Sequence, residues 1–536
     1  MKTDYLDYPY SSKRTTTFAK NGAVCTSQPL AARAGLEILQ KGGNAIDAAV
    51  AAAACLTVVE PTSNGIGGDA FALIWNDGKL HGINGSGKSP KKISREKVRD
   101  RGYEEMPKFG WEPVTVPGAP GTWAEVNQKF GRLPLKEVLK PAIEYAEKGY
   151  PVSPTTGRYW KAAYKRYKEE LKGEQFKSWF DTFAPNNRPP EIGEIWSSKG
   201  HAQTLKAIAE TQAKDFYEGE IADRIAAYSN KYNGFLEKED LASFAPEWVD
   251  PIKVNYRGYD VWELPPNGQG MVALMALGML NNYQFPYKNS VDTYHKQIEA
   301  MKLAMTDGKA YITDLDKMSY KVDQFLSKEY LNERASLIGE EALTPEKGKP
   351  AKGGTVYLAA ADNEGNMVSF IQSNYMGFGS GLVVPGTGIA LQNRGHLFSM
   401  DPEHDNTLEG NKRTFHTIIP GFLSQGDQPV GPFGVMGGYM QPQGHLQVIM
   451  NTIDFDLNPQ AALDAPRWQW MEDKKVIVEH SFPRDIAQKL ARKGHKIKVS
   501  LNSGSFGRGQ IIWKNPKNDV LISGVEHRTD SSAAVY

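Results

Sequence analysis

The sequence contains few cysteines and has almost no net charge. Cys25 and Cys55 are the only cysteines in 536 residues, and their small or apolar surroundings argue against a disulfide framework, although a single bridge stays open. Lys plus Arg number 63 and Asp plus Glu number 62, so the net charge of +1 supplies no overall field that would attract nucleic acid or an anionic membrane. We therefore expect chemistry on a small molecule and no nucleic-acid partner.

Long apolar runs and metal-binding motifs are also missing. The longest small and apolar stretch, "AIDAAVAAAACLTVV", contains Asp47 and is too short for a bilayer. The first twenty residues hold no apolar run with a cleavage site behind it, which predicts a cytoplasmic protein without a membrane partner. The ten histidines are dispersed and form no HExxH motif, and no CxxC occurs, so we expect no metal and no cofactor.

The pattern of apolar residues divides the chain into two parts. Residues 30–59 predict two helices separated by "KGGN", and residues 70–75 predict a strand that ends in a hairpin turn. Most of residues 134–339 read as helical, and "ELPPNGQGM" reads as a packed turn from strand to helix. After linker-like residues 343–354, strand signals dominate: "TVYLAAAD", "MVSFIQSN", "GLVVPGTGIALQNRG" and "PVGPFGVMGG". A helical and mixed segment, 1–354, thus precedes a strand-rich one, 355–536.

The junction "KGGTV" between these parts is open to two interpretations. If the bond between Gly354 and Thr355 is cut, Thr355 gains a free α-amino group, with a pKa of about 7.7 to 8.0, beside its own hydroxyl. One residue would then supply both the nucleophile and the base that activates it. The same letters are also a common way to end a loop and begin a strand, and local sequence alone favours that simpler interpretation.

The sequence on both sides of this junction favours cleavage over a simple turn. "GGNAIDAAVAAAACLTVVEPTSNGIGGDAFALI", "TVYLAAADNEGNMVSF", "GFGSGLVVPGTGIALQN" and "GVMGG" occur in this order, and together they closely resemble the γ-glutamyltransferase family, including its cephalosporin-acylase-like members. The resemblance runs from about Gly22 to Tyr536. It implies an α+β fold, a four-layer αββα sandwich of the N-terminal-nucleophile hydrolase type, made as one precursor that cuts itself into a large and a small subunit.

The resemblance also assigns catalytic positions. It implies cleavage between Gly354 and Thr355, with Thr355 as nucleophile and Ser373 where the family has a threonine that supports it. Gly437 and Gly438 match the paired glycines whose backbone N–H groups form the oxyanion hole. On its own, a Gly-Gly pair would predict no more than a turn.

The expected substrate site departs from the family pattern. Thr417 matches one of two serines that bind the substrate's α-carboxylate, and His416 replaces the other, where a packed histidine is an equally good interpretation. The arginine that typical members use for the same carboxylate is replaced by Ser86. The usual Gln and Asp that hold the α-ammonium group are replaced by Arg394 and Leu397.

These departures suggest a different acyl group. Tyr375 aligns with an asparagine that helps to bind substrate, although Asn374 is adjacent. Arg394 would repel an ammonium group but could grip a carboxylate from the opposite side of the pocket. We therefore expect an amide hydrolase or acyltransferase that acts on glutaryl-type amides at least as well as on γ-glutamyl amides. The alternative is a family member that has lost catalysis and serves as a binding or structural protein.

Overall fold

Strand β10 (Gly354–Asp362) has apolar side chains on both faces, which requires a packed layer on each side. A computed structural model describes residue 10, residues 14–345 and residues 354–536, and for Gly354 and Thr355 the backbone alone. Along β10, Val356, Leu358 and Ala360 face one hydrophobic core, whereas Tyr357, Ala359 and Ala361 face another. This alternation follows the two-residue period of a strand and places β10 in the interior of a layered molecule.

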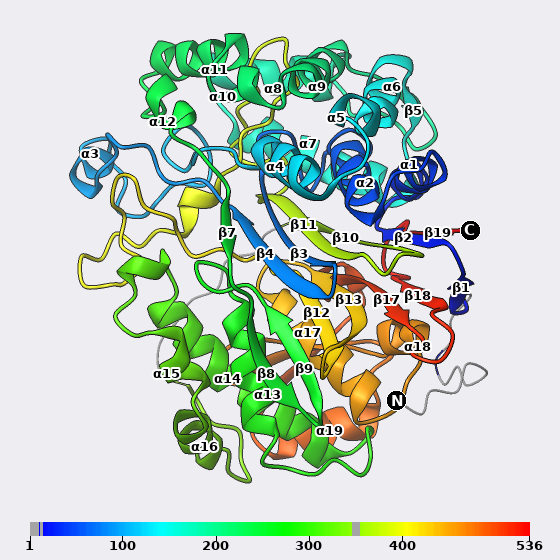
Figure 1. Ribbon diagram of the computed structural model, residues 1–536. Helices are drawn as coiled ribbons and strands as arrows, with labels where there is room; N and C mark the ends of the chain where they lie inside the picture. Colours follow the sequence, from blue (N-terminus) through cyan, green and yellow to red (C-terminus); the bar gives the residue numbers. More distant parts are fainter. Residues whose placement is uncertain (1–9, 11–13, 346–353) are drawn as a thin grey trace.

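Two antiparallel sheets lie face to face (Figure 1). The first sheet has the strand order β19 (Ser532–Val535), β2 (Gly22–Thr26), β10, β11 (Met367–Tyr375), β3 (Asp69–Asn76), β4 (Lys79–Gly85) and β7 (Glu247–Val249). The second has the order β1 (Thr17–Ala19), β18 (Leu521–Val525), β17 (Arg508–Lys514), β13 (Gln428–Met436), β12 (Gly421–Gln425), β9 (Tyr259–Glu263) and β8 (Ile252–Tyr256). A core that includes Phe71, Tyr357 and Phe422 fills the space between the sheets.

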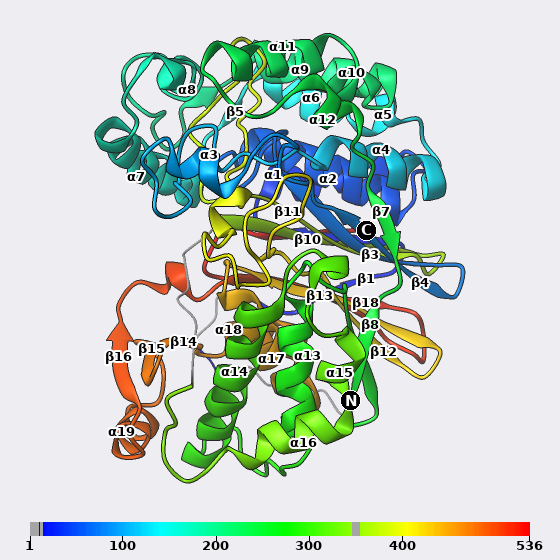
Figure 2. The same cartoon turned by 90° about the vertical axis from the view of Figure 1, so that its left-hand side faces the viewer.

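Helices cover the outer face of each sheet (Figures 1 and 2). Those on the side of the first sheet are α1 (Pro29–Gln40), α2 (Ala45–Val59), α3 (Arg95–Arg99), α4 (Ala119–Phe130), α5 (Leu135–Val138), α6 (Lys140–Lys148), α7 (Pro154–Glu170), α8 (Lys177–Phe183), α9 (Lys199–Thr211), α10 (Lys214–Tyr217), α11 (Glu220–Lys231) and α12 (Lys238–Ala242). Those on the side of the second sheet are α13 (Gly270–Leu280), α14 (Val291–Tyr311), α15 (Val322–Leu326), α16 (Lys328–Ser336), α17 (Met440–Ile453), α18 (Pro459–Asp464) and α19 (Arg484–Arg492). The expected αββα sandwich is confirmed.

Helix α2 shows why the alanine-rich stretch is needed. Every residue from Ala45 to Val59 is buried, because the helix lies between the first sheet and the other helices of that layer. Small side chains on all faces let these neighbours approach closely. The buried Asp47 closes a capping box with Asn44 and accepts a hydrogen bond from Asn127 Nδ2 at 2.8 Å, so its charge is compensated.

The two parts of the chain interleave in both sheets. Strand β10 opens the segment 355–536 and pairs with β2 and β11, and β13 lies between β12 and β17 in the second sheet. Strands β3, β4, β8 and β9, which come from residues before 354, complete the sheets. The predicted large and small segments therefore build one sandwich, and where the chain is divided between them stays a prediction.

Some expectations about local structure need correction. The stretch "GLVVPGTGIALQNRG" forms turns with an isolated bridge between Val383 and Ala390, because its glycines Gly381, Gly386 and Gly388 adopt positive φ angles that break a strand. Strands β7, β8 and β9 lie within the region that reads mostly as helical. Two small sheets complete the fold: β14 (Trp468–Glu472), β15 (Lys475–Glu479) and β16 (Lys496–Ser500), and β5 (Tyr150–Pro151) with β6 (Ile195–Trp196).

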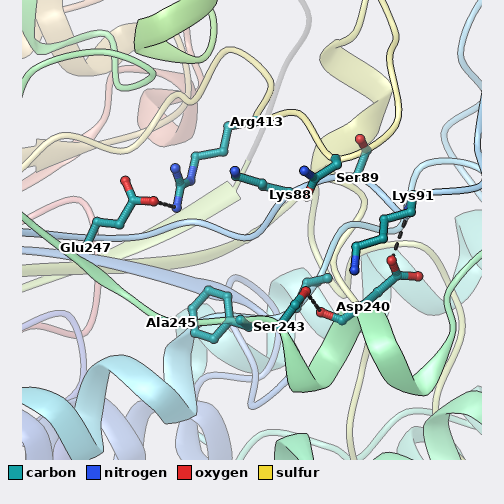
Figure 3. Close-up of a pocket in the computed structure, with 11 residues that line it drawn as sticks. Lys88, Ser89, Lys91, Asp240, Ser243, Ala245, Glu247 and Arg413 are labelled. Carbon is teal, nitrogen blue, oxygen red and sulfur yellow. Dashed lines mark hydrogen bonds and ion pairs between the residues drawn. The ribbon is translucent and has the colours of Figure 1, made fainter.

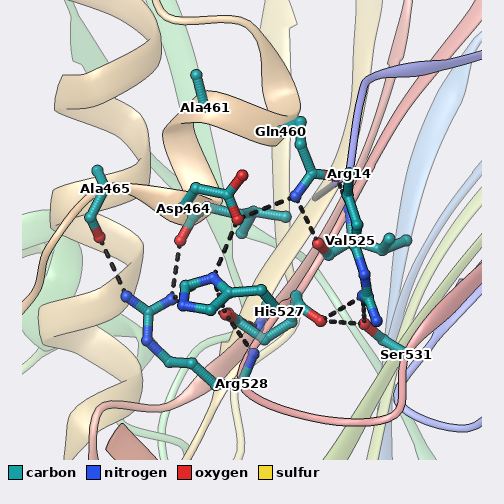
Figure 4. A network of polar contacts seen from close by, with 12 residues as sticks. Arg14, Gln460, Ala461, Asp464, Ala465, Val525, His527, Arg528 and Ser531 are labelled. Atoms are coloured by element: carbon teal, nitrogen blue, oxygen red, sulfur yellow. Dashed lines mark hydrogen bonds and ion pairs between the residues drawn. The ribbon is translucent and has the colours of Figure 1, made fainter. Parts of the chain in front are cut away.

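A buried polar network fixes the last strands against α18 (Figure 4). Arg528 donates to the carbonyls of Leu463 and Ala465 at 2.9 and 3.2 Å and pairs with Glu479 at 2.6 Å. Gln460 Nε2 donates to the carbonyl of Val525 at 2.9 Å. These bonds satisfy the end of a short helix that would otherwise leave buried carbonyls unpaired.

Among the helices that the structure describes, none combines the length and the apolar character that crossing a membrane requires.

Candidate active site

The backbone around Thr355 is held by an irregular strand pair. Gly354 lies opposite Tyr375 and Val356 lies opposite Gln372, so the register shifts and both Ser373 and Asn374 share the place opposite Thr355. Tyr375 adopts a positive φ of 73°, which is uncommon for a residue with a side chain. The Thr355 side chain and residues 346–353 lie outside what the structure describes, so the predicted nucleophile is located by its backbone alone.

Ser373 is fully buried at the end of β11. Its Oγ accepts a hydrogen bond from the backbone N–H of Tyr375 at 2.8 Å, and its backbone lies opposite Asp69 of β3. The bond orients the hydroxyl within the irregular pair. The predicted supporting residue therefore lies on the strand directly beside Thr355.

Gly437 and Gly438 follow β13 directly and lead into α17. Their φ angles are +139° and +60°, in the region that favours glycine, and a Cβ atom on Gly437 would lie 3.1 Å from the Cα of Gly507. Among the described residues, neither backbone N–H has a hydrogen-bond acceptor, whereas both carbonyls accept bonds from the first turn of the helix. Two unpaired N–H groups at a helix N-terminus can receive a negative oxygen.

Gln269 braces this turn and was not singled out from the sequence. Its Nε2 donates to the carbonyl of Gly438 at 2.9 Å and to that of Thr417 at 2.6 Å, which ties the two predicted subsites together. Gln269 comes from the "ELPPNGQGM" turn, which connects β9 to α13 as predicted. The glycines around it were the available signal, but they indicate only a tight turn.

Arg394 brings a positive charge into the interior beside Thr417. The side chain lies in the short 3-10 turn Arg394–Leu397 and is 1% exposed; its Nη1 donates to Thr417 Oγ1 at 2.6 Å. The guanidinium carbon lies 4.6 Å from the centroid of the Tyr375 ring. Nε and Nη2 find no acceptor among the described residues. Burial lowers the pKa of Arg394 to about 10, and the Asp69 carboxylate opposes this shift, so the group stays charged at neutral pH.

Asp69 and His416 form a buried pair near Arg394. His416 Nε2 lies 3.0 Å from Asp69 Oδ2, and His416 Nδ1 accepts a bond from the backbone N–H of Ile418 at 3.4 Å. Burial, together with the Arg394 charge, lowers the pKa of His416 well below its usual value, so the ring is neutral and the contact is a hydrogen bond. Burial raises the pKa of Asp69 to about 7, against the opposing charge of Arg394 and a bond from Gln392 Nε2 at 2.7 Å.

These contacts limit what His416 and Asp69 can offer a ligand. Both ring nitrogens of His416 are engaged, so the ring has no donor left for a carboxylate. Asp69 accepts bonds on both oxygens, from Gln392 and from His416. Nothing in the sequence distinguished Asp69, because an aspartate next to two glycines is typical of an exposed turn.

Ser86, at the place of the family's arginine, is hydrogen-bonded to other residues than Arg394. Its Oγ donates to Asn84 Oδ1 at 2.7 Å, and its carbonyl accepts from Arg413 Nε at 2.9 Å. Arg413 lines a separate pocket of about 320 Å³ beside β7 (Figure 3). There its Nη2 pairs with Glu247 at 2.8 Å, so the charge of Arg413 is compensated.

One buried cluster within the described residues has the composition of a metal site. Ligand-type atoms of His295, Glu299 and His495 all lie within 4.8 Å of one another. However, His295 Nδ1 and His495 Nε2 are hydrogen-bonded at 2.9 Å, and Lys302 Nζ lies 2.6 Å from Glu299 Oε1. The lysine already supplies the cation that this carboxylate needs, so the cluster is a polar network.

The four-layer sandwich, with β10 beginning at the Gly-Thr junction, has the architecture of the N-terminal-nucleophile hydrolases. The Gamma-glutamyltranspeptidase family model matches residues 31–536. The chain is 38% identical over 514 residues to the "Glutathione hydrolase-like YwrD proenzyme" of Bacillus subtilis (strain 168), covering 94% of this chain and 96% of that protein. It is 32% identical over 535 residues to the "Oxamate amidohydrolase proenzyme" of Klebsiella pneumoniae subsp. pneumoniae, covering 97% and 100%.

A solved structure agrees with these relatives. The cephalosporin acylase from Bacillus halodurans is 63% identical and superposes with a TM-score of 0.96 over 99% of each chain. The chain belongs to the γ-glutamyltranspeptidase family. It is a self-processing amide hydrolase of that family, and nothing in these similarities favours a non-catalytic role.

Proposed function

We propose that this protein hydrolyses amides whose acyl group ends in a carboxylate, with glutaryl amides as the preferred class. One observation carries the proposal: the buried, charged guanidinium of Arg394 has two nitrogen atoms without acceptors among the described residues. A buried charge with unsatisfied donors is costly, and a substrate carboxylate would satisfy them. Thr417 Oγ1, which already accepts from Arg394, has its own proton free to donate to the same carboxylate.

The same surroundings disfavour an α-ammonium group. Leu397 offers no acceptor, and Arg394 would repel a second cation. Asp69 is the nearby acid, and both of its oxygens are already hydrogen-bonded. A glutaryl group is a γ-glutamyl group without its amine. It therefore keeps the contact between its carboxylate and Arg394 and has no ammonium group for Arg394 to repel.

The chemistry would proceed through an acyl-enzyme. The free α-amino group of Thr355 takes the proton of its own hydroxyl as Oγ attacks the amide carbonyl, and Gly437 and Gly438 donate their N–H groups to the oxyanion. The amine then returns the proton to the leaving nitrogen as the C–N bond breaks. Water attacks the ester in the same way and releases the acid. Ser373 would orient the Thr355 hydroxyl.

The proposal requires that the precursor divide between Gly354 and Thr355 into segments 1–354 and 355–536. Denaturing electrophoresis and intact mass spectrometry of the purified protein are expected to give two chains, with Thr355 first in the smaller one. Thr355→Ala is expected to stay as one chain. A second chain that begins at another residue would overturn the assignment of the nucleophile.

The substrate class is tested with matched anilides. Glutaryl-p-nitroanilide is expected to be hydrolysed with a higher kcat/KM than γ-glutamyl-p-nitroanilide, and a large preference for the γ-glutamyl compound would refute the proposal. The series oxalyl, succinyl, glutaryl and adipyl anilide tests chain length, because a relative named for oxamate acts on a far shorter acid. If kcat/KM were highest for the oxalyl anilide, the role of Arg394 in binding a carboxylate would stand, but glutaryl amides would be rejected as the preferred substrates.

A further inference from the structure

Lys309 is a half-buried lysine without a carboxylate partner, near the C-terminal end of α14. Its Nζ lies 5.1 Å from the centroid of the Tyr439 ring and 5.0 Å from that of Trp470. In the part of the chain that the structure describes, no carboxylate oxygen lies within 4.0 Å of this nitrogen, and Glu472 acts on it only from a greater distance. Burial lowers the pKa of Lys309 to about 7.

Tyr439 connects this lysine to the predicted oxyanion site. It follows Gly438 directly in the chain, and its ring lies 5.7 Å from that of Phe415. The positive charge of Arg394 also acts on the Tyr439 hydroxyl. Gly437 and Tyr439 are both partly exposed, whereas Arg394 is buried. Lys309 therefore lies against a partly exposed ring that directly follows the two glycines in the chain.

We propose that Lys309 forms a subsite for an anionic group on the amine half of the substrate, the half that leaves when the amide is cut. The proposal rests on the hydrolysis argued above, in which Arg394 takes the carboxylate of the acyl half and the glycines take the carbonyl oxygen. An amine half that bears a carboxylate, as in cephalosporins and in glutathione, would pair with Lys309, which has no carboxylate partner among the described residues. The partly exposed ring of Tyr439 supplies an apolar surface for the body of such a group.

A pair of substrates that differ in one carboxylate isolates this subsite. Glutaryl-p-nitroanilide has a neutral leaving amine, and glutaryl-3-carboxy-4-nitroanilide has the same ring with a carboxylate. Lys309→Met is expected to lower kcat/KM for the carboxylated compound about tenfold relative to the plain one, mainly through KM, which is an interaction of about 1.4 kcal/mol. Lys309→Arg is expected to keep the ratio of the two.

Lys475→Met is the matched control. Lys475 pairs with Glu472 at 2.6 Å, and its side chain is 50% exposed, so this variant removes the same charge from the same neighbourhood without touching the rings. The control is expected to leave the substrate ratio unchanged. An unchanged ratio in Lys309→Met, or an equal fall in Lys475→Met, would overturn the proposal.

Two further measurements distinguish failure of the Lys309 subsite from failure of the proposed preference for glutaryl amides. The γ-glutamyl forms of both anilides are run in parallel, so a preference for γ-glutamyl would refute the glutaryl assignment while the carboxylate ratio is still measured. Calorimetry with the free amines, 5-amino-2-nitrobenzoate and 4-nitroaniline, reports binding without turnover. Lys309→Met is expected to weaken the former alone, and equal binding of the former to wild type and variant would count against Lys309.

Discussion

Replacing Arg394 by methionine should separate stability from activity. Methionine has a similar length and no donors, so it removes two buried nitrogen atoms that have no acceptor among the described residues. Each unsatisfied buried donor costs about 1 to 3 kcal/mol. The loss of the bond to Thr417, about 1.5 to 3 kcal/mol because the donor is charged, and of the contact with Tyr375, about 0.5 to 2 kcal/mol, opposes this gain. The free energy of unfolding of the substrate-free variant is therefore expected to be unchanged or higher.

Removing Arg394 also affects Asp69. The Arg394 charge holds the pKa of Asp69 below the value that burial alone would give, so the variant raises this pKa further and the carboxyl keeps its proton at pH 6. A neutral Asp69 needs no cation, and the measurement is therefore best made at that pH. Urea denaturation of wild type and Arg394→Met at pH 6 gives the two free energies.

The activity of the same variant should fall steeply. A substrate carboxylate buried without its partner loses about 3 to 5 kcal/mol, which corresponds to a fall in kcat/KM for glutaryl-p-nitroanilide of about 150- to 5,000-fold. Cleavage between Gly354 and Thr355 should persist, because no acyl carboxylate takes part in it. A parallel loss of stability and activity, or a loss of less than tenfold in kcat/KM, would refute the role given to Arg394.

Two further predictions concern buried charges. Because burial raises the folded pKa of Asp69 to about 7, above its unfolded value of about 3.9, wild type loses stability as pH rises from about 4 to 7; Asp69→Asn removes this loss. Between pH 4.5 and pH 7.5, measured by urea titration, the unfolding free energy of the variant relative to that of wild type should increase by roughly 3 kcal/mol, and parallel pH curves would contradict this. Glu299→Gln leaves Lys302 buried without its counter-ion and should cost about 3 to 5 kcal/mol, whereas the double variant Glu299→Leu/Lys302→Met should recover most of it; equal losses in thermal melts would disprove the pairing.

The layers of the fold are readable in the sequence because apolar periodicity reports burial. In α2 every residue is small or apolar apart from Asp47, and in β10 apolar residues occupy both faces, so burial of both elements can be predicted from the sequence. The sequence did not predict strands β8 and β9, because each is only five residues long and its few apolar residues alternate with polar ones, such as Lys253 and Asn255 in β8. Strand β9 pairs with β12, which comes much later in the chain, and local β-propensity cannot predict a partner so distant in sequence.

The site is less readable, because its residues come from separate parts of the sandwich. Arg394 stood out as a departure from a family pattern, but its unsatisfied nitrogen atoms depend on the packing around it. The glycines beside Gln269 indicated only a tight turn, and nothing in the sequence distinguished Lys309. A glutamine between two glycines and a lysine on an amphipathic helix are ordinary surface residues until the fold brings them against Gly438 and Tyr439.

The arrangement also explains why cleavage must follow folding. Thr355 begins a strand that is paired on both sides, by β2 and β11, only after the first sheet has formed. The N–H groups that would stabilise the oxyanion belong to Gly437 and Gly438, just after β13 of the second sheet, and Gln269 holds this turn from the segment before the proposed cut. No short piece of the chain contains these parts together. If the cut falls in "KGGTV" as proposed, this peptide bond is ordinary in the unfolded chain, and we expect it to become reactive only when both sheets have closed on each other.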